Sequence, residues 1–268
     1  MIHNKILITG SRGNVASHFI KKYQRKINLC TINKKLNKIN ALNKNDKLES
    51  VIHLGSVHKF PYFNKNPNKN YKKNIQIFDD IFKQTDKKIS NFFFTSTIDC
   101  GRKKFPKFKK KYIASKLLIE NKLRYYYKKK KINQVVIVRI PSILNLKSKT
   151  FINSFIFSII KNKNLILPEL PRKFNSITTK EDLSDFIFSC LKRKKRGFYL
   201  LNFCCKNPIS LIDLFKQLKK KYNSNSKLII NKMSSSKPIE CKKLNENFNF
   251  KVTSVKKAIS KYLNTIKA

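Results

Sequence analysis

Glycine, tryptophan and acidic residues are the scarce components of this sequence. Its 268 residues include five glycines and no tryptophan, and 14 acidic residues are set against 61 basic ones, so the formal net charge is +47. The six cysteines form no CxxC pair and no cluster with histidine at zinc-ligand spacing, which argues against a zinc finger or a disulfide scaffold. The longest apolar run, residues 151–160, is too short and too interrupted to span a bilayer. Because the N-terminus also lacks a signal-peptide pattern, we expect a cytoplasmic protein with no membrane span.

The large positive charge is carried mainly by lysine. Arginine occurs eight times, and lysine supplies the other 53 basic residues, which are spread along the whole chain. Lysine, asparagine, isoleucine and phenylalanine are all abundant and all have A+T-rich codons, so a biased genome is the simpler cause of the charge. Proteins that read nucleic-acid sequences favour arginine for bidentate contacts. We therefore expect non-specific attraction to polyanions but no specific nucleic-acid partner.

Short apolar runs alternate with amphipathic stretches through the first half of the chain. This order of strand, helix and strand, with strands apolar on both faces, predicts a parallel sheet wrapped by helices. The expected strands are residues 5–9, 27–32, 50–56, 91–97 and 134–140, and the expected helices are residues 14–26, 74–85 and 112–128. Residues 34–47 are weakly patterned and are expected to form a loop or a poor helix. The fold class is therefore α/β, a doubly wound parallel sheet of the Rossmann type.

The pattern loosens after about residue 145. Helices are expected at residues 153–163, 181–194 and 210–222, and a strand at residues 198–205. The helix at 181–194 has acids in its first turn and bases in its last turn, which suits the helix macrodipole, and Ser210 is placed to cap the next helix. We expect a dinucleotide-binding Rossmann domain over residues 1–145. Residues 146–268 should form mainly a small C-terminal α/β substrate lobe, with segments that return to the core.

Two of the five glycines lie together where the first strand turns into the first helix. In a doubly wound fold this turn holds the pyrophosphate of a dinucleotide, because glycine lets phosphate approach the backbone and the helix N-terminus offers free N–H groups. Gly10, Gly13 and Ala16 give the pattern G-x-x-G-x-x-A. A glycine pattern alone is weak, but its position between a strand and a helix strengthens it. The alternative is an ordinary strand–helix turn.

The end of the second strand bears on the choice between NAD and NADP. NAD-binding folds normally have an acid there that binds the ribose hydroxyls, but this sequence has Asn33, Lys34 and Lys35. Arg12 lies inside the glycine turn, and with Lys34 or Lys35 it is placed to hold a 2′-phosphate. We expect NAD or NADP as the cofactor, with NADP slightly favoured.

Thr97, Tyr112 and Lys116 form the candidate catalytic set. Thr97 ends an apolar strand, and Tyr112 and Lys116 are four residues apart, so they share one face of a helix. A lysine ammonium near a phenol stabilises the phenolate and lowers its pKa, which lets the tyrosine exchange a proton with an alcohol or ketone. Thr97 is placed to orient the same oxygen, and a nicotinamide alongside would exchange the hydride. By itself, YxxxK in a lysine-rich chain equally fits a solvated helix face.

Taken together, these residues resemble the extended short-chain dehydrogenases/reductases, in the NAD-dependent epimerase/dehydratase group that acts on nucleotide sugars. ITGSRGNVAS resembles the family's glycine turn, VIHLGS its third-strand signature, FFFTSTIDCG its serine/threonine strand, and VVIVRIPSILN its arginine–proline segment. Asn74 matches the family's helix asparagine. SITTKEDLSDFI and NPISLIDLF resemble segments of its substrate lobe.

The resemblance implies an NAD(P)-dependent oxidoreductase or epimerase with a nucleotide-sugar substrate, in the setting of surface polysaccharide synthesis. It implies Tyr112 as the acid/base, Lys116 as ribose ligand and tuner of the phenol, and Thr97 as the orienting hydroxyl. It also implies homodimers formed through the helices that carry Lys116, and it places Arg139 and Ser142 near the nicotinamide and substrate. The cofactor-binding residues we predict are Gly10, Arg12, Gly13, Asn14, Val15, Asn33, Leu54, Gly55, Ser56, Asn74, Tyr112, Lys116, Pro141 and Ile143.

Several positions depart from the family pattern. Leu144 and Asn145 stand where an aromatic residue and a glycine are usual, and the segment between Thr97 and Tyr112 is short. Dehydratases of the group have adjacent acids after the threonine, whereas Asp99 is here a single acid. These features leave an epimerase or a ketoreductase. A non-catalytic cofactor sensor or an RNA-binding protein with the same fold is the alternative, and the intact Tyr/Lys pair favours the enzyme.

The remaining polar and sulfur-containing residues receive structural interpretations. His53 is expected to be a packed core histidine and His58 a loop residue. Asp79 and Asp80 are expected on a helix surface rather than as a catalytic pair. Four cysteines are expected to be buried as small hydrophobic core residues: Cys30, Cys190, Cys204 and Cys205.

Overall fold

The chain divides into two compact units. The computed structural model describes residues 2–31, 48–57, 65–83, 88–102, 105–146, 148, 150–193, 195–234 and 237–267. The first unit comprises Met1–Ile140 and Lys180–Asn202, and the second comprises Pro141–Thr179 and Phe203–Ala268. The predicted loop at 34–47 lies outside the described residues, as do Asn33 and His58.

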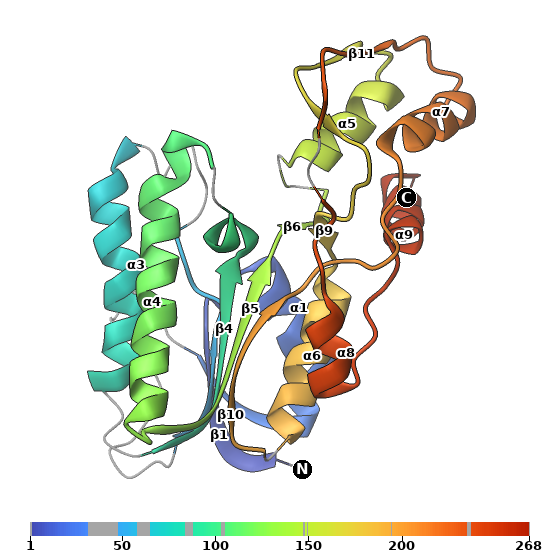
Figure 1. The fold of residues 1–268 in the computed structure, drawn as a ribbon. Coiled ribbons are helices and arrows are strands. Elements are labelled where there is room, and N and C mark those ends of the chain that lie inside the picture. The colour runs from blue at the N-terminus through green and yellow to red at the C-terminus, as the bar shows by residue number, and fades with distance from the viewer. Residues whose placement is uncertain are drawn as a thin grey trace. The chain divides into compact units, whose positions relative to one another are not determined.

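The first unit is built on a six-stranded parallel sheet, which confirms the predicted fold class (Figure 1). Its strands are β1 (Ile2–Thr9), β2 (Ile27–Thr31), β3 (Leu48–His53), β4 (Ile89–Thr97), β5 (Ile132–Ile140) and β10 (Gly197–Asn202). Their order across the sheet is β10-β5-β4-β3-β1-β2. The chain therefore proceeds one way from β1 to β2 and the other way from β3 onward. The carboxyl ends of β1 and β3 flank this reversal, where open α/β sheets bind their ligands.

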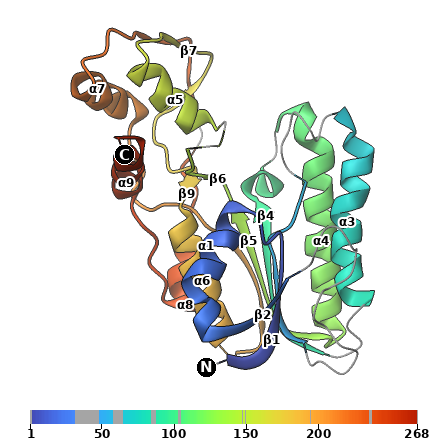
Figure 2. The same cartoon turned by 180° about the vertical axis from the view of Figure 1, so that it is seen from behind.

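Helices cover both faces of the sheet. They are α1 (Asn14–Tyr23), α3 (Pro67–Lys83), α4 (Lys110–Lys128) and α6 (Lys180–Lys192). Figure 1 shows α3 and α4 side by side on one face, and the opposite view in Figure 2 shows α1 and α6 together on the other. The core under α3 and α4 contains the buried rings of Phe78, Phe92 and Phe94. Burying one such side chain contributes roughly 1.5–3 kcal/mol, which explains why these strands are apolar on both faces.

Several predicted boundaries needed correction. The strand predicted at 198–205 ends at Asn202, and the helix predicted at 153–163 runs from Phe151 to Ile160. The third strand ends at His53, so the predicted strand at 50–56 is a strand only to that residue, and Leu54–Val57 form a loop. The helix predicted at 74–85 begins at Pro67. Proline suits the first helical position because it has no N–H to leave unpaired. The first turns were missed because they are mostly polar, and their buried face is made by the asparagines Asn70 and Asn74.

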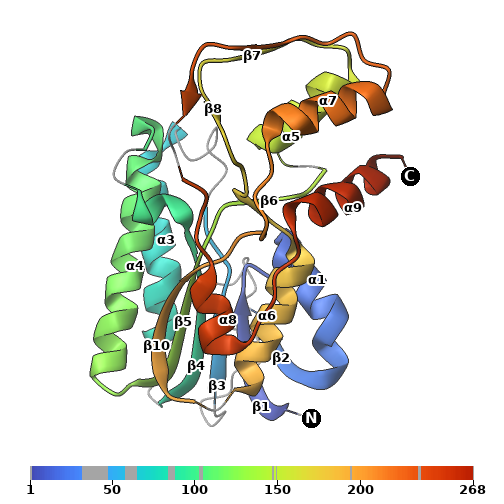
Figure 3. The same ribbon diagram turned by 45° about the vertical axis from the view of Figure 1, so that its right-hand side comes forward.

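The second unit is a smaller α/β assembly. Its helices are α5 (Phe151–Ile160), α7 (Leu211–Lys221), α8 (Lys242–Phe248) and α9 (Val255–Lys267). Its short strands pair in parallel as β6 (Ser142–Ile143) with β9 (Ile177–Thr178), β7 (Leu165–Leu167) with β11 (Leu228–Ile230), and β8 (Leu170–Pro171) with β12 (Met233–Ser234). Figure 3 shows α5 and α7 packed together. Ser210 caps α7 by accepting a hydrogen bond from the N–H of Asp213, as predicted.

Candidate functional site

The two glycines of the first turn are fixed by close backbone approach. Gly10 has φ +72°, in the left-handed region, and a Cβ there would lie 2.7 Å from the Cα of Gly55. The N–H of Gly13 donates to the carbonyl of Gly10 at 2.8 Å, and Gly13 is the N-cap of α1. The ends of β1 and β3 therefore meet at two glycines, Gly10 and Gly55, and the sequence predicted a cofactor role for both.

We expect Gly10→Ala to abolish tight dinucleotide binding. The left-handed backbone alone costs about 1–2 kcal/mol in an L-residue, and the new methyl group collides with backbone atoms that have no flexible side chain to move. The measurement is the melting temperature together with an NADH fluorescence titration. Ser17→Ala is the matched control, because Ser17 is exposed on α1, the helix that follows the turn. Wild-type affinity in Gly10→Ala would contradict the prediction.

The N-terminus of α1 can accommodate a phosphate. The first N–H groups of a helix have no intrahelical acceptor and carry the positive end of the helix dipole. The amide nitrogen Nδ2 of Asn14 is buried and has no hydrogen-bond partner among the described residues. Val15 is buried behind it, and Arg12 is exposed at the turn. A buried donor without a partner beside a glycine turn fits the pyrophosphate of a dinucleotide.

His53 supports the turn from within the core, as predicted for a packed histidine. Its ring is 1% exposed and stacks on Phe94. Nδ1 lies 2.7 Å from the hydroxyl oxygen of Thr9, and that oxygen also accepts the N–H of Gly55 at 3.0 Å. Nε2 has no hydrogen-bond partner in the described part of the chain. Burial, assisted by the charge of Lys116, lowers the pKa of His53 to about 3.

This pKa predicts a stability that falls as the solution is acidified. The folded-state pKa lies below the ordinary value of 6.5, so the unfolded chain takes up a proton first and the native state loses stability between pH 6.5 and 3. We expect wild type to lose about 2 kcal/mol more than His53→Gln between pH 7.5 and pH 5. Urea unfolding at both pH values measures this difference. His18→Gln, at a half-buried histidine on α1, should retain most of the wild-type slope, and equal slopes for wild type and His53→Gln would refute the prediction.

Asn74 joins the loop after β3 to the start of α4. Its Oδ1 accepts the N–H of Val57 at 2.7 Å, and its Nδ2 donates to the carbonyl of Val57 at 3.2 Å and to the hydroxyl of Ser115 at 3.3 Å. Ser115 in turn donates to the carbonyl of Tyr112 at 2.7 Å. The sequence identified Asn74 but missed Ser115. Apart from its place inside Y-I-A-S-K, Ser115 carries no signal in the sequence, and its complete burial emerges only in the structure.

Tyr112 and Lys116 share one face of α4, but their electrostatics differ from the prediction. Nζ of Lys116 donates to the carbonyl of Thr95 at 2.9 Å and lies 5.7 Å from the centroid of the Tyr112 ring. Burial raises the pKa of Tyr112, and a hydrogen bond with the side chain of Ser56 partly opposes this. Burial also lowers the pKa of Lys116 to about 8. The predicted lowering of the Tyr112 pKa by Lys116 is therefore wrong for this arrangement, because burial of the phenol dominates and the ammonium donates to a backbone carbonyl.

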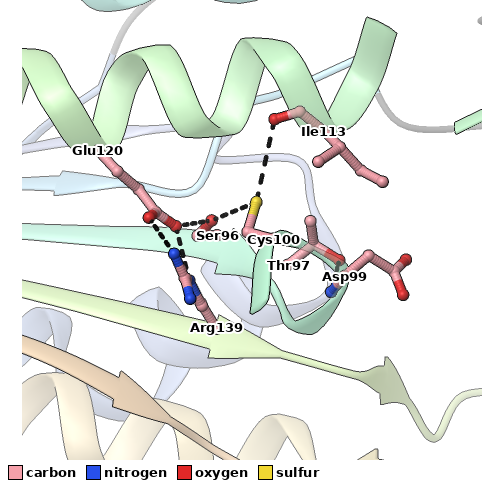
Figure 4. Close-up of polar contacts among 7 residues, drawn as sticks. All are labelled: Ser96, Thr97, Asp99, Cys100, Ile113, Glu120 and Arg139. Carbon is pink, nitrogen blue, oxygen red and sulfur yellow. Dashed lines mark hydrogen bonds and ion pairs between the residues drawn. The ribbon is translucent and has the colours of Figure 1, made fainter. Parts of the chain in front are cut away.

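The segment after Thr97 packs against the start of α4 (Figure 4). The hydroxyl of Thr97 accepts the N–H of Asp99 at 3.3 Å. Asp99 is buried, and its carboxylate binds Lys109 at 2.8 Å and Arg102 at 3.2 Å. Burial is the main cause of the raised pKa of Tyr112, and the Asp99 charge adds to it. The sequence noted Asp99 but gave no signal for its pairing with Lys109.

A buried ion pair joins Glu120 on α4 to Arg139 on β5 (Figure 4). Nε and Nη2 of Arg139 bind the two carboxylate oxygens of Glu120 at 3.1 and 2.6 Å, and the hydroxyl of Ser96 donates to Glu120 at 2.5 Å. The guanidinium of Arg139 is paired with Glu120, and its implied position near the nicotinamide and substrate stays a prediction. Sequence reasoning missed Glu120, although an acid four residues after Lys116 shares its helix face.

The other predicted residues are placed as follows. Leu54, Gly55 and Ser56 form the loop after β3 in the first unit. Pro141, Ser142 and Ile143 belong to the second unit, so their role toward a cofactor stays a prediction. Asp79 binds Lys122 on the helix surface, as expected. Within the described ranges, no group of three or more His, Cys, Asp or Glu side chains is placed to hold a metal ion, and no helix is both long and apolar enough to cross a membrane.

Comparison with known proteins identifies the fold. No family model and no curated protein sequence matches the chain. A short-chain dehydrogenase/reductase superfamily protein from Agrobacterium tumefaciens with bound NAD has a TM-score of 0.73 at 13% identity, covering 98% of this chain and 97% of its own. The chain therefore shares its fold with this short-chain dehydrogenase/reductase protein.

Two solved epimerases share the same fold along their whole length. UDP-glucuronic acid 4-epimerase from Bacillus cereus, in complex with UDP-glucuronic acid and NAD, has a TM-score of 0.72 at 16% identity and covers 98% of this chain and 99% of its own. UDP-glucose 4-epimerase from Thermotoga maritima, solved with UDP-glucose, has a TM-score of 0.71 at 14% identity and covers 98% and 100%. At these identities the likeness establishes the short-chain dehydrogenase/reductase fold, and the chemistry rests on the residues described above.

Proposed function

We propose that the protein is an NAD(P)-dependent epimerase or ketoreductase that acts on a nucleotide-diphosphate sugar. The observation that carries this proposal is the convergence of three features at one edge of one sheet. These are the Gly10–Gly55 turn, the Asn74–Ser115 bracket, and the Tyr112–Lys116 pair, whose tyrosine is hydrogen-bonded to Ser56. An ordinary strand–helix turn has no need of a tyrosine–lysine pair beside it.

The cofactor is held, in this proposal, by the turn after β1 and by the start of α4. The N–H groups at the start of α1 and the buried amide of Asn14 bind the pyrophosphate. Arg12, exposed in the same turn, contacts a 2′-phosphate and favours NADP. Lys116 holds the ribose beside the nicotinamide, where its pKa of about 8 keeps it mostly charged at neutral pH. When bound, the nicotinamide supplies reversible hydride transfer.

Tyr112 handles the proton at the substrate oxygen. Because its pKa is raised, the phenol is protonated at neutral pH and is set to donate to the oxygen of a substrate carbonyl. The reverse step, removal of a hydroxyl proton, requires the positive charge of Lys116 to approach the phenol oxygen from the Thr95 carbonyl. Thr97 orients the same substrate oxygen. An epimerase uses both steps in succession, and a ketoreductase uses only the first.

The substrate class and setting complete the proposal. The resemblance to the nucleotide-sugar group supports a sugar diphosphate nucleotide, with the second unit as the substrate lobe. It also supports a place in surface polysaccharide synthesis in the cytoplasm. We propose a homodimer formed through α4, where Tyr125 is a large apolar ring that is 57% exposed. Size-exclusion chromatography of wild type and Tyr125→Lys tests that assembly.

The proposed function is tested by cofactor binding followed by turnover. Purified protein is titrated with NADH and NADPH at moderate salt by fluorescence, and then incubated with NAD and UDP-glucose or UDP-glucuronic acid while the 4-epimers are separated by chromatography. We expect saturable binding, a preference for NADPH that Arg12→Ala removes, and epimer formation or NAD(P)H oxidation with the corresponding 4-keto sugar. Binding of neither dinucleotide at moderate salt would overturn the proposal.

A further inference from the structure

Two cysteines of the second unit face each other at contact distance. The Sγ atoms of Cys204 and Cys241 are 2.7 Å apart, although 36 residues separate them in the sequence. Both are free thiols. Cys204 is fully buried, whereas Cys241 is half-buried, so Cys241 is the member of the pair nearer to solvent. A disulfide has an S–S length of about 2.05 Å, and small side-chain rotations would bring these two sulfurs to it.

The two segments that carry the thiols are held together independently of the sulfurs. Asn175 is 4% exposed, and its side chain donates to the carbonyl of Ile239 at 2.9 Å and accepts the N–H of Ile239 at 2.9 Å. The same Nδ2 lies 3.4 Å from the Sγ of Cys204. The next residue, Cys205, donates its N–H to the carbonyl of Ile177 at 2.8 Å. The approach of Cys241 to Cys204 is therefore set by a buried amide bracket.

The two sulfurs are also differentiated for exchange chemistry. A hydrogen bond from Cys204 lowers the pKa of Cys241, whereas the same contact and burial raise the pKa of Cys204. Burial raises the pKa of Cys100 and of Cys190, which have no thiol partner in the described part of the chain. A thiolate is the nucleophile in sulfur chemistry, so Cys241 is the attacking sulfur and Cys204 is the resolving one.

We propose that Cys204 and Cys241 form a reversible dithiol/disulfide site that a hydroperoxide oxidises. The Cys241 thiolate attacks the terminal oxygen of the hydroperoxide, the O–O bond breaks, and the alcohol or water leaves with the sulfenic acid left on Cys241. Cys204 then attacks that sulfur, the S–S bond forms, and water leaves with the proton of Cys204. One hydroperoxide is reduced for each dithiol oxidised. A low-molecular-weight dithiol reverses the reaction by thiol–disulfide exchange. The site is separate from the proposed dinucleotide chemistry and does not depend on it.

The experiment is a peptide map of the full-length protein before and after exposure to hydrogen peroxide. Free thiols are blocked with iodoacetamide, the protein is digested without reduction, and linked peptides are identified by mass spectrometry. We expect one dominant crosslink between Cys204 and Cys241 that dithiothreitol removes. Cys205→Ser is the matched control, because it changes the neighbouring buried thiol and should leave the crosslink intact.

Two further variants test the separate roles of the two sulfurs. In Cys241→Ser, rapid peroxide consumption should be lost, and in Cys204→Ser a sulfenic acid should accumulate on Cys241 and be trapped by dimedone. Circular dichroism checks that each variant folds. If Cys204→Ser does not fold, the peptide map of the wild-type protein still tests the crosslink. A map dominated by a Cys204–Cys205 link or by links between chains would overturn the proposal. So would full iodoacetamide labelling of Cys241 after peroxide treatment.

Discussion

Tyr112→Phe is expected to reduce turnover by about 10²–10⁴-fold, the usual contribution of a positioned acid or base. The substitution removes only the phenol oxygen, so the ring can keep its position beside Lys116 and the bracket through Ser115 is untouched. Affinity for NADH or NADPH should remain within about twofold of wild type, because the glycine turn is unchanged. The measurements are kcat for the sugar substrate and a dinucleotide titration of the same preparation.

The control for this experiment lies on the same helix. Tyr125→Phe makes the same chemical change at an exposed ring, and it should leave kcat unchanged. A pH profile adds a second test, because the raised pKa of Tyr112 predicts that carbonyl reduction stays active to alkaline pH, while the reverse oxidation gains rate as pH rises. Wild-type turnover in Tyr112→Phe would remove this residue from the mechanism and leave dinucleotide binding as the supported property.

The features that sequence predicted well are those set by local pattern. Apolar runs such as the one ending at Thr97 must be buried on both faces, so they predict a parallel sheet with helices on each side. The glycine pair predicted the turn after β1 because left-handed backbone and close approach exclude other residues, and Gly10 shows both. His53 was predicted as a core residue from its apolar surroundings alone. In each case the neighbouring residues supply the physical cause.

The features that sequence could not predict arise from contacts between distant segments. The pKa of Tyr112 is raised chiefly by burial under segments distant in the sequence, while Nζ of Lys116 donates to the carbonyl of Thr95. The partner of Arg139 is an acid 19 residues earlier, on another element. The meeting of Cys204 with Cys241 depends on the Asn175 bracket. Periodicity and spacing carry no information about such pairings. The pairings determine the chemistry of the site more than they determine its fold.

Glu120→Ala is expected to cost about 3–5 kcal/mol of folding stability, the range for removing one partner of a buried ion pair. The side chains of Glu120 and Arg139 are 7% and 17% exposed, so the guanidinium would remain largely buried without its carboxylate, and Ser96 would lose its acceptor. Ser96 adjoins Thr97, and Glu120 is one turn after Lys116. We therefore expect a loss of kcat in the folded fraction as well, measured below the melting temperature.

A second ion pair, between α3 and α4, provides the control that separates burial from charge pairing. Asp79 and Lys122 are joined by contacts of 2.6 and 2.8 Å, but their side chains are 30% and 32% exposed. Asp79→Ala should therefore cost no more than about 1 kcal/mol. The double variant Glu120→Leu with Arg139→Met should recover most of the stability, because it leaves no buried charge without a partner. If urea unfolding showed the same loss of stability for Glu120→Ala and Asp79→Ala, the Glu120–Arg139 pair would be solvated. Lys116 would then be held in place by the Thr95 carbonyl and the packing of Phe94 instead.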